Sequence, residues 1–331
     1  MASTRGPRVV RWGILGTGGI NERFLAHVRE APGTTFEAVG SRTADRAAAF
    51  AARYGIERAH GSYEALLADP AIDAVYICLP NALHHPWTMK ALAAGKHVLC
   101  EKPYSRRPAE VIEAFDAADA AGLKLMEAFM WRHTRQARMF MELLPEVGEL
   151  QAIRATFSFR IEDTADVRLR PDLDGGSLMD VGCYCLSGAR LITGEPDRVH
   201  GEQVVGESGV DVAFSGLLHF PGEAAATISS GFHSEHATLE AIGSDATLTL
   251  VDPFTGRAKT LRIGERDVAV APQDPYRLEV ENFNAAIRGE GEPLLGRADA
   301  LGQARAIEAL YRSADTGTTV SLELAVGTQG R

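Results

Sequence analysis

The 331-residue sequence lacks any apolar stretch close to the ~20 residues that a membrane-spanning helix needs. Its first residues, MASTRGPRVVRWGIL, also lack the apolar core of a secretory signal peptide. These absences argue against an integral membrane protein and against an exported one. We therefore expect a cytoplasmic protein.

Cysteine is scarce, and the four cysteines do not form a C-x-x-C pair. This spacing argues against structural zinc and redox chemistry and suits a reducing compartment. No histidine and carboxylate set has the spacing of metal ligands either. We expect the cysteines to be small core residues and the protein to need no metal.

The chain also lacks positive charge, with 34 Lys and Arg against 44 Asp and Glu and a formal net charge of -10. Without a local basic run, this balance argues against nucleic acid and anionic membranes as partners. Hydrophobic residues at 45% and charged residues at 24% are typical of a folded globular protein. At roughly 150 residues per domain, the length predicts two domains.

The first third alternates short apolar runs with amphipathic stretches, which predicts βαβ units and a parallel sheet. The expected strands are 9–15, 36–41, 74–79, 97–101 and 124–127, with helices between them at 44–54 and 86–94. After about residue 130, β-rich alternation predicts a mostly antiparallel sheet, and helices are expected at 177–192, 276–288 and 298–314. We therefore expect an α/β fold class, with a first domain at 1–128 and a second domain at 129–331.

A glycine-rich turn directly follows the first expected strand and precedes a helix. Glycines at such a place allow a tight turn and a close approach of the backbone to a pyrophosphate at the helix N-terminus. The third position of this fingerprint is Asn21, whose bulk weakens the expectation of close helix–strand packing. A simple glycine turn is the alternative. The expected cofactor contacts here are Gly16, Thr17, Gly18, Gly19 and Ile20.

The second expected strand ends in Ser41 and Arg42 and not in the carboxylate that would bind the ribose 2′-hydroxyl of NAD. A serine hydroxyl and an arginine fork suit a 2′-phosphate, and Arg46 adds a second cation one helical turn later. This pattern favours NADP, with NAD still possible. The alternative is a solvated basic helix start, although arginine in a first turn opposes the helix dipole.

Two later motifs are distinctive: the Pro-Asn-x-x-His turn at 80–84 and the Gly-Lys-His-Val-x-x-Glu-Lys-Pro run at 95–103. With EAFMWR at 127–132 and the segment at 175–194, they resemble the Gfo/Idh/MocA oxidoreductase family over nearly the whole chain. The resemblance implies an N-terminal Rossmann domain, a C-terminal α/β domain with a large open antiparallel sheet, and hydride transfer between NAD(P) and a sugar or polyol. Further expected cofactor contacts are Leu79, Pro80, Asn81, His84, Glu101 and Lys102, with helix capping as the alternative for Asn81.

The Met-Asp-Val-Gly-x-Tyr segment at 179–184 resembles one subgroup of this family. That subgroup contains glucose-fructose oxidoreductases, dimeric dihydrodiol dehydrogenases, NADP-dependent xylose dehydrogenases and sugar 3-ketoreductases. The chain departs from it at Thr134-Arg135, where relatives often have His-Pro. Arg132 and Arg135 are tentative substrate contacts.

Oxidation of an alcohol needs a base for the hydroxyl proton, and reduction needs an acid for the nascent alkoxide. Lys102 follows a strand terminus, where an open α/β sheet places its ligand crevice. Asp180 and Tyr184 lie four residues apart and share one flank of an expected helix. We expect these three to be catalytic, although a surface lysine and a packed tyrosine are the alternatives for Lys102 and Tyr184.

The leading functional hypothesis is an NADP-dependent oxidoreductase acting on a sugar, ketosugar or polyol. The alternatives are a glycoside hydrolase of similar fold that retains its NAD, and a non-catalytic nucleotide-sensing protein. Apolar residues in VDVAFSGLLHF and AATISSGFH predict an exposed patch on the C-terminal sheet. We therefore expect a homodimer or homotetramer through that sheet.

Overall fold

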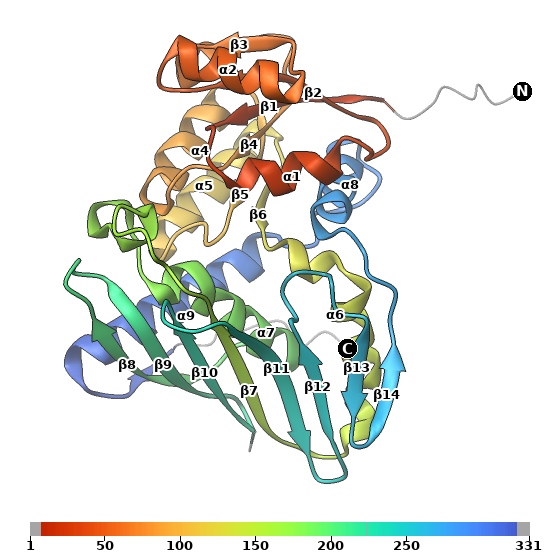
Figure 1. The fold of residues 1–331 in the computed structure, drawn as a ribbon, viewed down its shortest axis with the longest axis vertical. Coiled ribbons are helices and arrows are strands. Elements are labelled where there is room, and N and C mark those ends of the chain that lie inside the picture. Colours follow the sequence, from red (N-terminus) through yellow and green to blue (C-terminus); the bar gives the residue numbers. More distant parts are fainter. Residues whose placement is uncertain (1–7, 223, 323–331) are drawn as a thin grey trace, which may run out of the picture. The chain divides into compact units, whose positions relative to one another are not determined.

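The computed structural model describes residues 8–222 and 224–322, which form two compact units (Figure 1). Unit 1 takes the described residues of Met1–Ser105 together with Ala109–His133 and Asp274–Ala300. Unit 2 takes Arg106–Pro108, Thr134–Gln273 and the described residues of Leu301–Arg331. Each unit combines segments that are separated in the sequence, and so the units differ from the contiguous division at 128/129 that we expected.

Unit 1 contains a six-stranded parallel sheet in the order β3-β2-β1-β4-β5-β6. This is the strand order of a dinucleotide-binding Rossmann sheet, so the predicted parallel fold is confirmed. The short β3 was not predicted. The strands are β1 (Val10–Leu15), β2 (Thr34–Gly40), β3 (Arg58–His60), β4 (Ala74–Ile77), β5 (His97–Glu101) and β6 (Leu125–Ala128).

Helix α8, from late in the sequence, completes the apolar core of unit 1 beside α1. The ring of Phe24 stacks on Tyr76 with centroids 3.8 Å apart and meets Tyr276 of α8 edge-on. Trp12 packs against Phe283 and donates a hydrogen bond from its indole to Asn284. The helices are α1 (Ile20–Val28), α2 (Ala44–Tyr54), α3 (Tyr63–Leu67), η1 (Asn81–Leu83), α4 (His84–Ala93), α5 (Pro108–Ala121), η2 (Met130–His133) and α8 (Pro275–Ile287).

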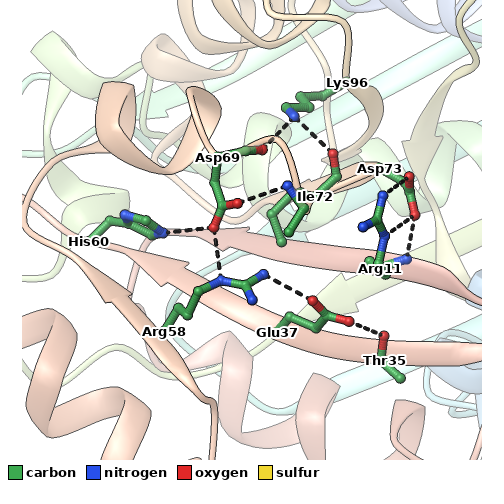
Figure 2. A network of polar contacts seen from close by, with 10 residues as sticks. Arg11, Thr35, Glu37, Arg58, His60, Asp69, Ile72, Asp73 and Lys96 are labelled. Carbon is green, nitrogen blue, oxygen red and sulfur yellow. Dashed lines mark hydrogen bonds and ion pairs between the residues drawn. The ribbon is translucent and has the colours of Figure 1, made fainter.

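A polar network closes the edge of this sheet at which the strands begin (Figure 2). Arg11 in β1 donates from its backbone, Nε and Nη2 to Asp73, which precedes β4. Arg58 in β3 joins Glu37 and Asp69 at 2.9 Å each. The ammonium of Lys96, just before β5, donates to the carbonyls of Asp69 and Ile72. Each cation of the network is thus matched by acceptors of the protein itself.

Unit 2 contains a nine-stranded sheet in the order β14-β13-β12-β11-β7-β10-β9-β8-β15. All neighbours pair antiparallel except β7 and β10, which are parallel, so the prediction of a mostly antiparallel sheet is confirmed. The strands are β7 (Leu150–Ser158), β8 (Arg198–Val205), β9 (Asp211–His219), β10 (Ala225–Gly231), β11 (His236–Gly243), β12 (Thr247–Val251), β13 (Thr260–Ile263), β14 (Arg266–Ala269) and β15 (Val320–Ser321).

The helix expected at 177–192 begins as a π-helical turn, η6 (Leu178–Gly182), and continues as α7 (Cys183–Thr193). In the π turn the N–H of Cys183 donates to the carbonyl of Leu178, five residues earlier. Helix α7 packs against β7 and β10. The remaining helices are α6 (Arg135–Leu143), η3 (Leu144–Val147), η4 (Val167–Leu169), η5 (Pro171–Leu173) and α9 (Arg297–Thr316).

The expected apolar patch on β9 and β10 is wrong in its main part. Phe214, Leu218 and Ile228 are buried, whereas the neighbouring exposed positions are mostly polar, as at Ser215 and Thr227. Alternation along each strand turns the large residues inward, as it does on a sheet with one solvated face. Leu217, 46% exposed, is the large apolar side chain that remains outward.

All four cysteines are buried and carry free thiols, which confirms them as core residues. Within 8–222 and 224–322, no helix combines the length and apolar character that crossing a membrane requires. The same residues show no cluster of three or more His, Cys, Asp or Glu side chains suited to a metal ion.

Candidate active site

The glycine turn of unit 1 has the shape that a pyrophosphate requires. Gly16 has φ +112°, and a Cβ there would lie 3.0 Å from Leu79 and 3.2 Å from the thiol of Cys78. Helix α1 starts directly after the turn, and in the described part of the chain no side chain caps its N-terminus at Gly19. A backbone approach and an uncapped helix start are the features that hold phosphate in dinucleotide-binding folds. The turn residues therefore fit the phosphates of a nicotinamide dinucleotide.

Asn21, the departure from the glycine fingerprint, braces this turn. Its side chain is fully buried, and its amide donates to the carbonyls of Gly16 and Gly18 at 3.3 and 3.0 Å. The same amide nitrogen lies 3.1 Å from the sulfur of Cys78, which follows β4. The expectation that its bulk would loosen the packing is therefore wrong, because the amide satisfies buried carbonyls inside the turn.

The end of β2 carries the residues expected to bind a 2′-phosphate. Ser41 is buried, and its hydroxyl lies 3.5 Å from that of Thr17 in the glycine turn. Arg42 and Arg46 are exposed, and among the described residues no carboxylate pairs with either guanidinium. Burial raises the pKa of the Tyr63 phenol, and the positive charges of both arginines oppose that rise. The two cations and this phenol therefore belong to one local cluster.

His84, the first residue of α4, is buried between two backbone carbonyls. Its Nδ1 lies 2.9 Å from the oxygen of Pro103, and its Nε2 lies 2.8 Å from the oxygen of Leu79. Burial lowers the pKa of His84, whereas the two carbonyls favour the doubly protonated ring. The ring thus ties the end of β4 to the Lys102-Pro103 turn, and a contact with cofactor stays a prediction. Asn81 opens η1, and the N-cap position of α4 is Leu83.

Glu101 ends β5, and Lys102 follows it at the same edge of the sheet. One oxygen of Glu101 accepts a hydrogen bond from the Tyr76 hydroxyl, and the other accepts from the backbone of Lys102 at 3.3 Å. Behind this pair, burial and the negative charge of Glu101 raise the pKa of the fully buried Glu279 well above its usual range. Both effects favour the protonated form of this carboxyl group.

The expected cofactor residues of unit 1 follow neighbouring strands at their carboxyl ends. The turns after β1, β2, β4 and β5 begin at Gly16, Ser41, Cys78 and Lys102. Because these four strands are adjacent and parallel, their ends meet at one edge of the sheet. In such sheets this edge is where ligands bind, next to the point at which the strand order reverses.

Asp180 lies in the π turn of unit 2, where Arg168 engages it. The Arg168 Nε donates to Asp180 Oδ2 at 2.8 Å, while its Nη1 reaches Asp166 at 3.2 Å. The negative charge of Asp180 is the largest cause that raises the pKa of Arg168. Burial lowers this pKa, and the negative charge of Asp166 raises it further. The charge of Asp180 is therefore balanced within unit 2. Arg168 was missed from the sequence, although the alternation of charges along ADVRLRPDLD was a signal for it.

Tyr184, in the first turn of α7, has its ring in an aromatic cluster. Phe157 meets the ring edge-on at 5.5 Å, and Phe254 lies tilted at 5.4 Å. The residue is 8% exposed. These contacts fix the ring from β7 and from the segment after β12, which sets the direction of its hydroxyl.

The two tentative substrate arginines both engage carboxylates. Arg132 pairs with Asp299 at 3.4 Å and lies over the Trp131 ring. Arg135 pairs with Glu142 at 2.5 Å, and its backbone donates to Gln273. Contact of either with a substrate stays a prediction.

Comparison with known proteins finds family matches for both halves of the chain. Residues 10–129 match the oxidoreductase family with an NAD-binding Rossmann fold, and residues 145–249 match the Gfo/Idh/MocA C-terminal domain. The chain is 41% identical over 323 residues to D-xylose 1-dehydrogenase (NADP(+)) 2 of Haloferax volcanii, covering 94% of this chain and 99% of the relative.

Solved structures agree with this placement. The 3-ketoreductase KijD10 of Actinomadura kijaniata, solved with NADP and TDP-benzene, is 31% identical with a TM-score of 0.88, over 92% of this chain and 98% of that one. The aldose-aldose oxidoreductase of Caulobacter crescentus, solved with glycerol, is 28% identical with a TM-score of 0.88, over 95% and 100%. The predicted family and fold are confirmed: the chain belongs to the Gfo/Idh/MocA family of oxidoreductases.

Proposed function

We propose that this chain is an NADP-dependent oxidoreductase that transfers a hydride between the nicotinamide and a sugar, ketosugar or polyol. The observation that carries the proposal is the edge of the parallel sheet, where the glycine turn, the Ser41-Arg42 pair and Lys102 follow adjacent strands. The NADP in the names of the Haloferax dehydrogenase and the Actinomadura ketoreductase structure supports the choice of cofactor. Bound NADP supplies the hydride acceptor, and NADPH the donor.

We assign the proton to Lys102 and Tyr184. A free tyrosine titrates near ~10, so at neutral pH it is a competent acid for reduction but a poor base unless a cation stabilises its phenolate. The Lys102 ammonium supplies that cation and polarises the reacting oxygen. Asp180 orients the lysine or the substrate hydroxyl. Because Arg168 balances its charge, we assign it no proton transfer.

Tyr184→Phe tests this assignment. Loss of the proton donor should lower kcat by about 10² to 10⁴ while leaving the binding of NADPH unchanged, since general acid–base catalysis contributes a factor of that size. The neighbouring Phe157→Leu is the control for packing, because it alters the aromatic cluster and keeps the phenol. A kcat for Tyr184→Phe within twofold of the wild type would remove this tyrosine from the mechanism.

A substrate panel tests the function itself. Absorbance at the NADPH band is followed with aldoses including D-xylose, ketosugars, polyols and diols, in both directions. We expect stoichiometric release of NADPH during oxidation of at least one sugar or polyol. Hydrolysis of a glycoside without net NADPH would instead support the cofactor-retaining hydrolase, and binding without turnover would support the sensor.

We also propose that the chain forms a homodimer or homotetramer through the sheet of unit 2. Leu217, Val204 and Val205 are 46, 61 and 54% exposed on adjacent strands β9 and β8. Most exposed positions on β9 and β10 are polar, and contact between copies would remove these three apolar side chains from water. Sedimentation equilibrium should show a species larger than 35.6 kDa at micromolar concentration. A stable monomer would refute the proposal.

A further inference from the structure

Asp211, the first residue of β9, is a buried carboxylate outside the residues assigned so far. It is 3% exposed and accepts three hydrogen bonds. Its Oδ2 accepts from the Ser177 hydroxyl and from the Leu178 backbone N–H, each at 2.8 Å. Its Oδ1 accepts from the Tyr311 hydroxyl of α9, also at 2.8 Å. One carboxylate thus joins a sheet strand to two helical segments of unit 2.

The Oδ2 contacts lie at the start of the helical segment that carries Asp180 and Tyr184. Leu178 opens the π turn, so its N–H is one of the first-turn donors that a helix leaves without a partner. A carboxylate at this end also interacts favourably with the helix dipole. Asp211 therefore fixes where this segment begins and how it is rotated about its axis.

Glycine permits this close approach. A Cβ at Gly176, which has φ +120°, would lie 2.1 Å from Asp211 Oδ1. At the other end of the π turn, a Cβ at Gly182 would lie 2.8 Å from the Ser230 hydroxyl of β10. Ser230 itself contacts the Ser177 hydroxyl at 3.1 Å. The π turn is thus held against two adjacent strands at both of its ends.

We propose that Asp211 is a positioning residue for catalysis, which sets the placement of the Tyr184 hydroxyl and the Asp180 carboxylate through its bonds to Ser177 and Leu178. The inference rests on the proposed roles of Tyr184 and Asp180. Small displacements of a catalytic group have large effects on rate, because the reacting geometry is held within fractions of an ångström. The loss of these hydrogen bonds should therefore lower kcat.

Tyr311 provides a matched control on the same carboxylate. Its hydroxyl bonds the other oxygen at the same distance, but it comes from α9 and not from the catalytic segment. If Asp211 has a purely structural role, removing the partner of either carboxylate oxygen should lower kcat only in proportion to the loss of melting temperature. A positioning role predicts that only the Oδ2 side affects turnover.

The test compares Asp211→Asn, Ser177→Ala and Tyr311→Phe in the full chain. For each, kcat, the KM for NADPH, the pH profile of kcat and the melting temperature are measured, using the panel sugar with the highest kcat/KM in the reduction direction. We expect Asp211→Asn to lower kcat about 10- to 100-fold. The asparagine amide places either its NH2 group or a neutral oxygen opposite the Leu178 N–H, so this N–H loses its carboxylate acceptor. Ser177→Ala, the milder variant, should lower kcat about 3- to 10-fold by the same route.

In both variants we expect the KM for NADPH to stay within twofold. On the proposed role of Lys102 as the cation that stabilises the phenolate, the alkaline limb of the kcat profile should move to higher pH in both variants. Tyr311→Phe should lower the melting temperature but leave kcat and its pH profile within twofold. The inference is overturned if Ser177→Ala and Asp211→Asn keep wild-type kcat when folded, or if Tyr311→Phe lowers kcat as much as Asp211→Asn.

Tyr184→Phe, run in the same series, separates this inference from the proposed function. If Tyr184→Phe loses activity and the Asp211 and Ser177 variants do not, the positioning role fails alone. If Tyr184→Phe keeps activity while Asp211→Asn lowers kcat, the proposed acid fails, and the positioning of the segment stands through Asp180.

Discussion

Two pairs of arginines at opposite edges of the same parallel sheet have opposite surroundings. At the edge where strands begin, Arg11 and Arg58 are held by Asp73, Glu37 and Asp69. At the edge where strands end, Arg42 and Arg46 are exposed and, among the described residues, meet no carboxylate. An arginine fork that the protein satisfies stabilises the fold, whereas one that it leaves open can bind a ligand phosphate.

The difference implies that substitutions at the two edges have different effects. Variants at the edge where strands begin, which we call the beginning edge, should unfold more easily and remain active while folded. Variants at the ending edge should remain stable and lose cofactor binding or turnover.

The largest effect is expected for Lys102→Ala at the ending edge. It should lower kcat by at least about 10² to 10⁴, since the reacting oxygen loses both its electrostatic support and the stabilised phenol. Its melting temperature should stay close to that of the wild type. Steady-state kinetics and thermal denaturation check both statements, with Lys124→Ala, a surface lysine paired with Glu292, as the control. A Lys102→Ala enzyme that is active but unstable would reverse the comparison.

Arg42→Ala should raise the KM for NADP about 10- to 100-fold, because a charge-assisted hydrogen bond contributes roughly 1.5–3 kcal/mol. The KM for NAD, which has no 2′-phosphate, should be nearly unchanged. Arg53→Ala on α2, the helix that follows Arg42, is the control, since Arg53 pairs with Glu22. Tighter binding of NAD than of NADP by the wild type would contradict the assignment.

Asp73→Asn at the beginning edge should lower the free energy of unfolding by about 1–3 kcal/mol, because three donors of Arg11 lose a charged acceptor. The kcat of the folded variant should equal that of the wild type. Urea denaturation and kinetics measure the two, and Glu57→Gln, at an exposed position, is the control. An Asp73→Asn enzyme of normal stability and reduced kcat would show that this edge serves catalysis.

The smallest expected effect is a pH dependence of the difference in unfolding free energy between the wild type and Asp73→Asn. Hydrogen bonds from Arg11 lead the causes that lower the pKa of Asp73 in the folded protein. A lowered pKa stabilises the fold at pH values above the unfolded pKa of about 3.9, and this contribution is lost as pH falls through the folded value. The free-energy difference between wild type and Asp73→Asn should therefore be constant from pH 7 to 5 and shrink below about pH 4. A difference that grows on acidification would show the sign to be wrong.

Local patterns in the sequence predicted the parallel strands of unit 1 other than β3, and five of the long helices. The strand expected at 97–101 matches β5 (His97–Glu101), and the helix at 44–54 matches α2 (Ala44–Tyr54). Strand β3 (Arg58–His60) was missed because three residues, two of them polar, carry no alternating pattern. Its Arg58 and His60 are held by side chains from other elements, which periodicity does not report.

The candidate site divides in the same way. The turns after the parallel strands were predicted because strand ends of one sheet meet at one edge. The Arg168–Asp180 pair and the Asp211 contacts were not, because their partners lie 12 and 33 or more residues apart in the sequence. The buried amide of Asn21 was misjudged, because its three acceptors are brought together only by the folded turn.

The late arrival of α8 affects how the chain folds during synthesis. The sheet of unit 1 ends with β6 at Ala128, yet Tyr276 and Phe283 of α8 add their rings to the aromatic cluster around Phe24 and Trp12. At about 5–20 residues per second, the roughly 150 residues between them take about 8–30 s to translate. During that time the nascent Rossmann unit lacks α8, so we expect a chain that stalls before residue 275 to expose aromatic surface and to bind chaperones.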